Sequence, residues 1–252
     1  MQSFFVRKEQ LHTENKEIEI LGDNFNHIKN VLRYNIGDKL NIVVENESKY
    51  LCMIKEITKE TIICDIESRI DSNCEANIKI DIYQGLPKFD KMELIIQKSV
   101  ELGANAIIPL KMKRCVVKID EKSENKKIER WQKIAESAAK QSGRDIIPQI
   151  ANVTKIDELA KRITQYDIVI VCYENEQKNK LKTELLQLKN NMKEHPEIKI
   201  AVVIGPEGGL EENEVELLKQ NGAKIVTLGK RILRTETVAL NVLGIIMYEF
   251  ES

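Results

Sequence analysis

The sequence predicts an α/β protein with two parts: a small β-barrel followed by a parallel, doubly wound sheet. Up to about residue 72 the chain is a series of short apolar segments separated by turn signals, which is typical of a β-rich domain. From residue 78 segments with strand character alternate with segments of helical periodicity, which favours a parallel sheet covered by helices. We therefore expect two domains, 1–72 and 73–252.

The N-terminal domain contains five predicted strands and one inserted helix. The helix is expected over 24–33, because Ile28, Val31 and Leu32 recur at helical spacing. A polar, non-periodic stretch at 69–77 is expected to link the domains. The predicted strands are 3–6, 16–21, 39–46, 49–58 and 60–68.

The C-terminal domain repeats strand and helix to its end. Gly103 is expected to end the first helix as a C-cap. The last helix, from about Glu236, carries one apolar stripe made by Ala239, Val242, Leu243, Ile246, Met247 and Phe250. The predicted strands are 78–83, 106–110, 167–173, 198–204 and 224–228. The predicted helices are 89–103, 126–143, 178–192, 211–222 and 236 onward.

Composition disfavours several classes of protein. Hydrophobic residues make up 42% and charged residues 31% of the chain, as in globular proteins. No segment has the roughly 18 apolar residues of a membrane span, and the N-terminus lacks the features of a signal peptide, so we expect a cytoplasmic protein. The five cysteines form no CxxC pair and the three histidines are far apart, so no metal site is expected.

Positive charge is concentrated in one region of a nearly neutral chain. Residues 85–145 carry 14 Lys and Arg against 9 Asp and Glu. Such a region can hold a phosphate backbone, although the same lysines could simply solvate helix faces. The residues predicted to contact RNA phosphates are Arg7, Arg33, Lys111, Lys113 and Arg114.

Three predicted loops, at 174 onward, 205–209 and 229–235, follow strands and should meet at one edge of the sheet, where α/β proteins bind ligands. The middle loop, "GPEGGLEENE", has no phosphate-binding fingerprint and is acidic, so it would repel a phosphate. S-adenosylmethionine, which has no phosphate and a positive sulfur, fits better. Glu211, Glu212 and Glu214 could merely complement the helix dipole, whereas Glu207 lies between glycines before the helix.

The third loop, within "LGKRILRTETVAL", places Lys230, Arg231 and Arg234 in one turn. Thr235 is expected to be the N-cap of the last helix. Arg234 could pair with Glu236 on the surface, or it could bind an anion or a base edge at the mouth of the pocket.

These two loops closely resemble the signature of the SPOUT class of methyltransferases. The segments "HIKNVLRYNIGD", "LPKFDKMELIIQKSVELGANAIIPLKMKRCVV" and "RWQKIAESAAKQSGR" narrow the resemblance to the ribosomal RNA small subunit methyltransferase E family. That family methylates ring nitrogen 3 of a uridine in 16S ribosomal RNA. The resemblance implies an RNA-binding PUA-like barrel, a SPOUT-type parallel sheet with a trefoil knot, and a homodimer.

The resemblance also assigns residues to the cofactor loops and to other signature positions. The predicted contacts to S-adenosylmethionine are Gly205, Glu207, Gly208, Gly209, Leu228, Gly229, Leu233, Arg234 and Thr235. The other signature positions are Arg33, Arg114, Gln141 and Arg144.

Methylation at nitrogen 3 requires loss of the imide proton and stabilisation of the resulting anion. Arg234 is the first choice for this stabilisation and Arg144 the second; Glu207, Glu236 or solvent could accept the proton. The small ribosomal subunit is the expected substrate. The alternatives are a non-catalytic RNA-binding or ribosome-assembly module with the same fold, and a nucleotide-dependent metabolic enzyme.

Overall fold

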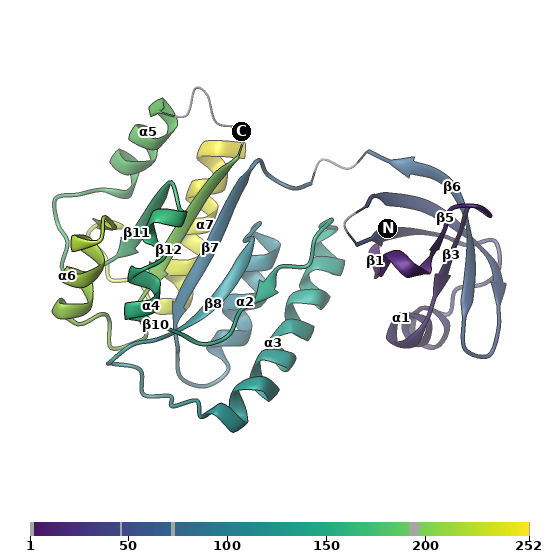
Figure 1. Cartoon of the computed structure of the whole chain (residues 1–252), viewed down its shortest axis with the longest axis horizontal. Helices are drawn as coiled ribbons and strands as arrows, with labels where there is room; N and C mark the ends of the chain where they lie inside the picture. Colours follow the sequence, from purple (N-terminus) through teal and green to yellow (C-terminus); the bar gives the residue numbers. More distant parts are fainter. Residues whose placement is uncertain (1–2, 46, 72–73, 192–196, 252) are drawn as a thin grey trace. The chain divides into compact units, whose positions relative to one another are not determined.

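The computed structural model describes residues 3–45, 47–71, 74–191 and 197–251, and it divides into two compact units (Figure 1). The first unit comprises Met1–Glu75 and Ala139–Ile147, and the second comprises Ala76–Ala138 and Pro148–Ser252. The sequence boundary at 72/73 did not include the segment 139–147 in the N-terminal part. None of the helices in the described ranges is long and apolar enough to cross a membrane.

The first unit is a six-stranded sheet in the order β1-β4-β5-β6-β3-β2. Only the β1–β4 pair is parallel. The strands at the two ends of this order, β1 and β2, are separated by only four residues, which span at most about 18 Å. Six flat strands would be about 24 Å across, so the sheet must curl. The strands are β1 (Ser3–Val6), β2 (Leu11–His12), β3 (Glu17–Ile20), β4 (Lys39–Val44), β5 (Lys49–Ile57) and β6 (Ile62–Ile70), with the short helix η1 (Lys8–Gln10) between the first two.

The curled sheet encloses a core of side chains that alternate along the strands, among them Phe4, Ile42 and Ile54. The predicted helix is split into α1 (Gly22–Asn26) and a π-helical turn, η2 (His27–Leu32). Within it Ile28 is buried, but Val31 is 68% exposed, because a π turn does not keep the helical spacing.

Residues 139–147 join the first unit through polar contacts. The buried Arg144 donates from Nε and Nη2 to the two carboxylate oxygens of Glu75, at 3.2 and 2.5 Å. Lys49 Nζ lies 3.1 Å from Asp145 and also donates to the carbonyl of Gly143. The long helix α3 (Glu121–Ser142) therefore begins in the second unit and ends in the first.

The second unit is built on a parallel sheet in the order β10-β8-β7-β12-β11-β13, with β9 paired to β8. The prediction of a parallel sheet is confirmed. Two short strands, β9 and β10, have too few residues for a sequence pattern. The strands are β7 (Ile78–Gly85), β8 (Ala106–Lys111), β9 (Gln149–Ile150), β10 (Thr154–Lys155), β11 (Ile168–Cys172), β12 (Ile198–Ile204) and β13 (Lys224–Val226).

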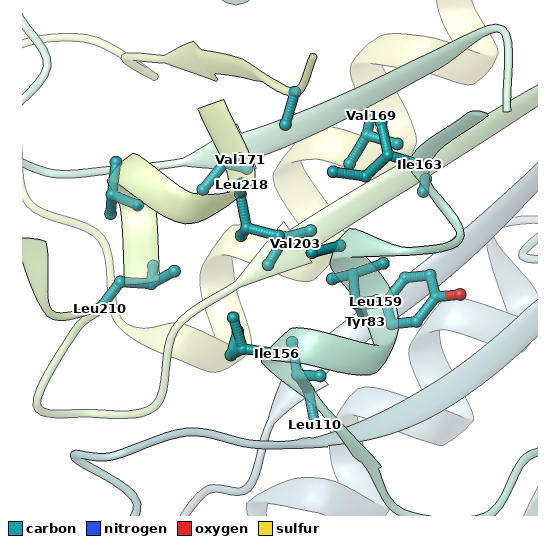
Figure 2. Close-up of a cluster of buried hydrophobic side chains, with 14 of the residues drawn as sticks. Tyr83, Leu110, Ile156, Leu159, Ile163, Val169, Val171, Val203, Leu210 and Leu218 are labelled. Atoms are coloured by element: carbon teal, nitrogen blue, oxygen red, sulfur yellow. The ribbon is translucent and has the colours of Figure 1, made fainter. Parts of the chain in front are cut away.

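Helices cover both faces of this sheet. On one face α4 and α6 bury Leu159 and Leu218 against alternate strand residues such as Val171 and Val203 (Figure 2). On the other face α7 packs against α2, β7 and β12, and its predicted apolar stripe is buried from Ala239 to Met247. The helices are α2 (Lys91–Glu101), α4 (Ile156–Ala160), η3 (Ile163–Gln165), α5 (Leu181–Asn191), α6 (Glu212–Gln220) and α7 (Thr235–Glu251).

Candidate functional site

A pocket of about 480 Å³ lies at the carboxyl ends of β11, β12 and β13, where the sequence predicted that three loops would meet. All nine residues predicted to contact the cofactor line it. The other residues that line it are Lys91, Cys172, Tyr173, Glu174, Ile204, Pro206, Thr227, Lys230, Arg231, Ile232 and Val238.

The glycine-rich loop is held in place from both ends. It follows the buried strand residue Ile204, and directly after it Leu210 enters the core below the pocket (Figure 2). Gly209 has a φ of +70°, and a Cβ atom there would collide with the carboxylate of Glu174. Because the Glu174 carboxylate is the end of a flexible side chain and could move, the position requires glycine for its backbone conformation rather than for space.

Most of the carboxylates around this loop already have partners. Glu207 accepts hydrogen bonds from the backbone N–H of Lys88, at 3.0 and 3.3 Å, and lies 3.2 Å from Lys91 Nζ. Burial alone would raise the pKa of Glu207, but its hydrogen bonds with backbone N–H groups and Lys91 outweigh burial and lower that pKa. Glu207 is therefore an ionised carboxylate at neutral pH.

The acidic residues at the start of α6 act on the local fold. Glu214 accepts hydrogen bonds from the backbone N–H of Glu211 at 2.9 Å and of Lys113 at 2.8 Å. Glu211 pairs with Lys113 Nζ at 2.8 Å. The simpler interpretation, that these residues support the helix start, therefore holds for Glu211 and Glu214.

Glu174 differs from Glu207, Glu211 and Glu214. It is exposed, it lines the pocket from the end of β11, and it has no hydrogen bond or ion pair with any residue that the structure describes. An unpaired carboxylate favours a neutral or positively charged group of the ligand at this point of the pocket. Near it, burial raises the pKa of Cys172 to about 12, so that side chain is a neutral thiol.

Three cations on the opposite loop are free of ion pairs with the described residues. Lys230, Arg231 and Arg234 are all exposed and all line the pocket. The alternative of a surface pair between Arg234 and Glu236 is not what the structure shows, and Glu236 instead lies 3.2 Å from Lys91 Nζ.

The predicted role of Thr235 as an N-cap is wrong. Thr235 is the first residue of α7, and the first-turn N–H groups of Thr237 and Val238 bond to the carbonyl of Arg234. The Thr235 hydroxyl instead donates to the carbonyl of Gly205 at 2.7 Å and accepts from Gln84 Nε2 at 2.8 Å. This buried chain of hydrogen bonds joins β7, the glycine-rich loop and α7 beneath the pocket.

The remaining predicted site residues lie away from the pocket lining. Arg144 is in the first unit, buried and bound to Glu75. Arg7 and Arg33 are exposed in that unit, and Arg33 has a left-handed backbone at the end of η2. In the second unit Lys111 is exposed.

Two of the predicted RNA-binding residues contact the glycine-rich loop or the start of α6. Lys113 pairs with Glu211, and Arg114 Nη1 donates to the carbonyl of Gly208 at 3.0 Å. The contact between Arg114 and Gly208, and the positions of Lys91 and Gln84 near the pocket, were not predicted from the sequence. The only signal for Arg114, Lys91 and Gln84 is that they lie near the ends of β7, which neighbours β12 in the sheet, and of β8, which neighbours β7.

Comparisons with known proteins agree with this architecture. A family model described as RNA methyltransferase domain matches residues 74–247, and one described as RNA methyltransferase PUA domain matches residues 20–67. Ribosomal RNA small subunit methyltransferase E of Bacillus subtilis (strain 168) is 38% identical over 253 residues, which covers 100% of this chain and 98% of the relative. The protein of the same name from Mesomycoplasma hyopneumoniae (strain 232) is 31% identical and covers 95% of this chain and 96% of that one.

A solved structure has the same fold. It is a ribosomal RNA small subunit methyltransferase E from Neisseria gonorrhoeae bound to S-adenosylmethionine; its TM-score is 0.82 at 27% identity, and the match covers 98% of this chain and 97% of that one. The first unit is thus PUA-like, and the second is a methyltransferase domain on a parallel sheet. The chain belongs to the ribosomal RNA small subunit methyltransferase E family.

Proposed function

We propose that this protein transfers the methyl group of S-adenosylmethionine to ring nitrogen 3 of a uridine in 16S ribosomal RNA, with the small ribosomal subunit as substrate. The observation that carries the proposal is the pocket at the carboxyl ends of β11, β12 and β13, which gathers all nine residues predicted for the cofactor. Family membership supports the reaction class.

The pocket suits S-adenosylmethionine in size and in chemistry. Its volume of about 480 Å³ is in the range of small-molecule sites. Gly208 and Gly209 bring backbone close to the ligand, and Glu174 offers an unpaired carboxylate to a positively charged group. When bound, the cofactor supplies an electrophilic methyl group on a positive sulfur. Glu207 is held by Lys88 and Lys91, so its proposed role is to order the glycine-rich loop and not to bind the positive sulfur of the cofactor.

Arg234 is assigned to stabilise the uracil anion. Its guanidinium is exposed on the pocket lining and free of partners among the described residues, so its donors are available to the carbonyl oxygens of an imide. Arg144 does not suit this role, because its guanidinium is already bound to the carboxylate of Glu75.

Solvent is the proposed acceptor of the imide proton. Glu207 has a lowered pKa and two partners, Lys88 and Lys91, and Glu236 is paired with Lys91, so neither carboxylate is free to accept the proton. The protein then contributes in two ways: the Arg234 guanidinium stabilises the uracil anion, and the pocket holds the uracil in position for methyl transfer. Positioning of this kind supplies much of the rate.

The proposal includes the trefoil knot of the SPOUT class and a homodimer. The knot is supported by the sequence, because the loops 205–209 and 229–235 match the signature of the SPOUT class. The dimer is supported by exposed apolar side chains on two helices that pack together: Leu94 of α2, and Ile245 and Tyr248 of α7. Light scattering of the purified protein should give twice the mass of the chain.

Cofactor binding separates this proposal from its rivals. Titration calorimetry should show binding of S-adenosylmethionine and none of ATP or NAD, and Gly209→Ala should weaken that binding because alanine disfavours the positive φ of the loop. Binding of RNA without binding of S-adenosylmethionine would favour the non-catalytic RNA-binding module.

A further inference from the structure

An exposed aromatic residue lies beside the pocket and has a backbone conformation that bulky residues rarely adopt. Phe89 has a φ of +55°, in the left-handed region, and its side chain is 89% exposed. Bulky residues are rare in this region because the Cβ atom crowds the backbone. Exposure means that no packing in the described chain compensates for the strain, which points to a role in binding.

The loop that carries Phe89 is fixed to the pocket. On one side the backbone N–H of Lys88 donates to both carboxylate oxygens of Glu207, and on the other Lys91 pairs with the same carboxylate at 3.2 Å. Both Glu207 and Lys91 line the pocket. Leu86 and Met92 are each 2% exposed, so the loop is anchored in the core at both ends and Phe89 is held at its tip.

The surroundings favour a nucleic acid over an apolar partner. The pocket beside Phe89 is lined by Lys230, Arg231 and Arg234, which are exposed and unpaired within the described ranges. An aromatic face next to unpaired cations is the combination by which proteins hold single-stranded nucleic acid: the cations hold phosphates and the ring stacks on a base.

We propose that Phe89 is a stacking platform for a base of the RNA substrate at the mouth of the methyl-transfer pocket. The inference rests on the proposed function, because it takes RNA as the substrate. It adds a residue that acts on the substrate alone: Phe89 binds an unstacked base, either the target uracil or its neighbour, and so favours the opened form of the RNA that the reaction needs.

The first test uses three replacements at this position, with binding of a single-stranded oligouridine of about ten nucleotides as the readout. Phe89→Ala should weaken oligouridine binding by about 5- to 150-fold, the effect of losing one base stack. Phe89→Tyr should retain the affinity of the natural protein for oligouridine. Phe89→Gly should weaken it as much as alanine does, yet have a Tm equal to or above that of the natural protein, because glycine relieves the strained φ.

A second measurement reports on stacking directly. In Phe89→Trp, oligouridine should quench the fluorescence of the new exposed indole, over the constant signal of Trp131, which is 6% exposed. Leu186→Ala is the control, since Leu186 is an apolar side chain 43% exposed on α5 that lies neither on the proposed dimer surface nor among the residues that line the pocket. It should leave oligouridine binding unchanged.

The outcomes separate this inference from the proposed function. Unchanged oligouridine binding in Phe89→Ala, with methyl transfer intact in the natural protein, would overturn the stacking role alone. Light scattering could instead show that Phe89→Ala has a lower mass than the natural protein, with RNA affinity reduced only as far as the dimer is lost. That result would show that a second copy of the chain covers Phe89, and it would also overturn the stacking role. Absence of methyl transfer by the natural protein would contradict the proposed function, while the oligouridine measurements would still decide the stacking role.

Discussion

At the scale of single residues, Arg234 carries the chemical part of the proposal. Removal of its guanidinium should take away a donor that acts on the uracil anion but not on the cofactor. Arg234→Ala should therefore lower kcat by about 10²- to 10³-fold and leave the Kd for S-adenosylmethionine within about twofold. Single-turnover kinetics and calorimetry would measure the two effects. Lys224→Ala, at an exposed cation on β13, is the control. Equal losses in kcat and in affinity for S-adenosylmethionine would contradict the assignment of Arg234 to the uracil anion.

Glu207 should affect stability rather than proton transfer. Its pKa is lowered in the folded protein, so its ionised form stabilises the fold above its ordinary pKa of about 4.5, and this contribution is lost as the pH falls through the lower folded value. Glu207→Gln should therefore have a lower Tm at pH 7, and the difference from the natural protein should shrink below about pH 4.5. Thermal unfolding across this range would test it. A difference that grew in acid would show that the carboxylate is not held ionised.

Residues whose role follows from local sequence could be predicted, and those whose partner comes from elsewhere in the chain could not. The glycines in 205–209 predict that the backbone can approach a ligand closely, and all three of them line the pocket. Thr235 looks like a cap because only its neighbours are visible in the sequence; its actual partners, Gln84 and Gly205, are 151 and 30 residues away. Likewise nothing near Arg144 indicates that its partner is Glu75.

At the scale of elements, the buried hydroxyl of Thr235 couples α7 to the glycine-rich loop. Thr235→Val should leave the Gly205 carbonyl and Gln84 Nε2 without their partner and destabilise the protein by about 1–3 kcal/mol, with weaker binding of S-adenosylmethionine. Thr235→Ser keeps the hydroxyl and should retain both properties to within a small margin. Urea unfolding and calorimetry would measure them. If valine and serine behaved alike, the hydroxyl would have no such role.

Elements with a long, regular pattern were the ones that the sequence predicted well. The stripe along the last helix places Ala239, Leu243 and Ile246 in the core, as expected. The helix predicted over 24–33 was only partly right, because a π turn at His27–Leu32 rotates Val31 to the surface. A single turn of irregular helix leaves no periodicity to detect.

At the scale of the whole molecule, the structure divides the predicted RNA-binding cations into two kinds. Lys111 is exposed and unpaired among the described residues, whereas Arg114 is bonded to Gly208 and Lys113 to Glu211. Lys111→Ala should therefore lower the salt slope of RNA binding by about 1 and leave cofactor affinity unchanged.

Arg114→Ala should give the reverse pattern. It removes the bond to the Gly208 carbonyl, so it should weaken binding of S-adenosylmethionine while the salt slope of RNA binding stays the same. Both slopes would come from titrations between 50 and 200 mM salt, a range in which phosphate contacts dominate the change. A fall in the slope for Arg114→Ala equal to that for Lys111→Ala would show that both cations contact phosphates.

The division of the chain into units was predictable only in outline. The change of rhythm near residue 72 marks the end of the β-rich part, because strands and helices bury apolar side chains with different periods. The return of 139–147 to the first unit depends on Arg144, Asp145 and the carbonyl of Gly143, and their contacts with Glu75 and Lys49 are remote in sequence.

Methyl transfer itself tests the central claim most directly. Purified protein would be incubated with isotopically labelled S-adenosylmethionine and small ribosomal subunits that lack the modification, and the RNA would then be digested and its nucleosides separated. The proposal predicts label in 3-methyluridine from the natural protein and at least about 10²-fold less from Arg234→Ala. Bound cofactor with no label in 3-methyluridine would contradict it.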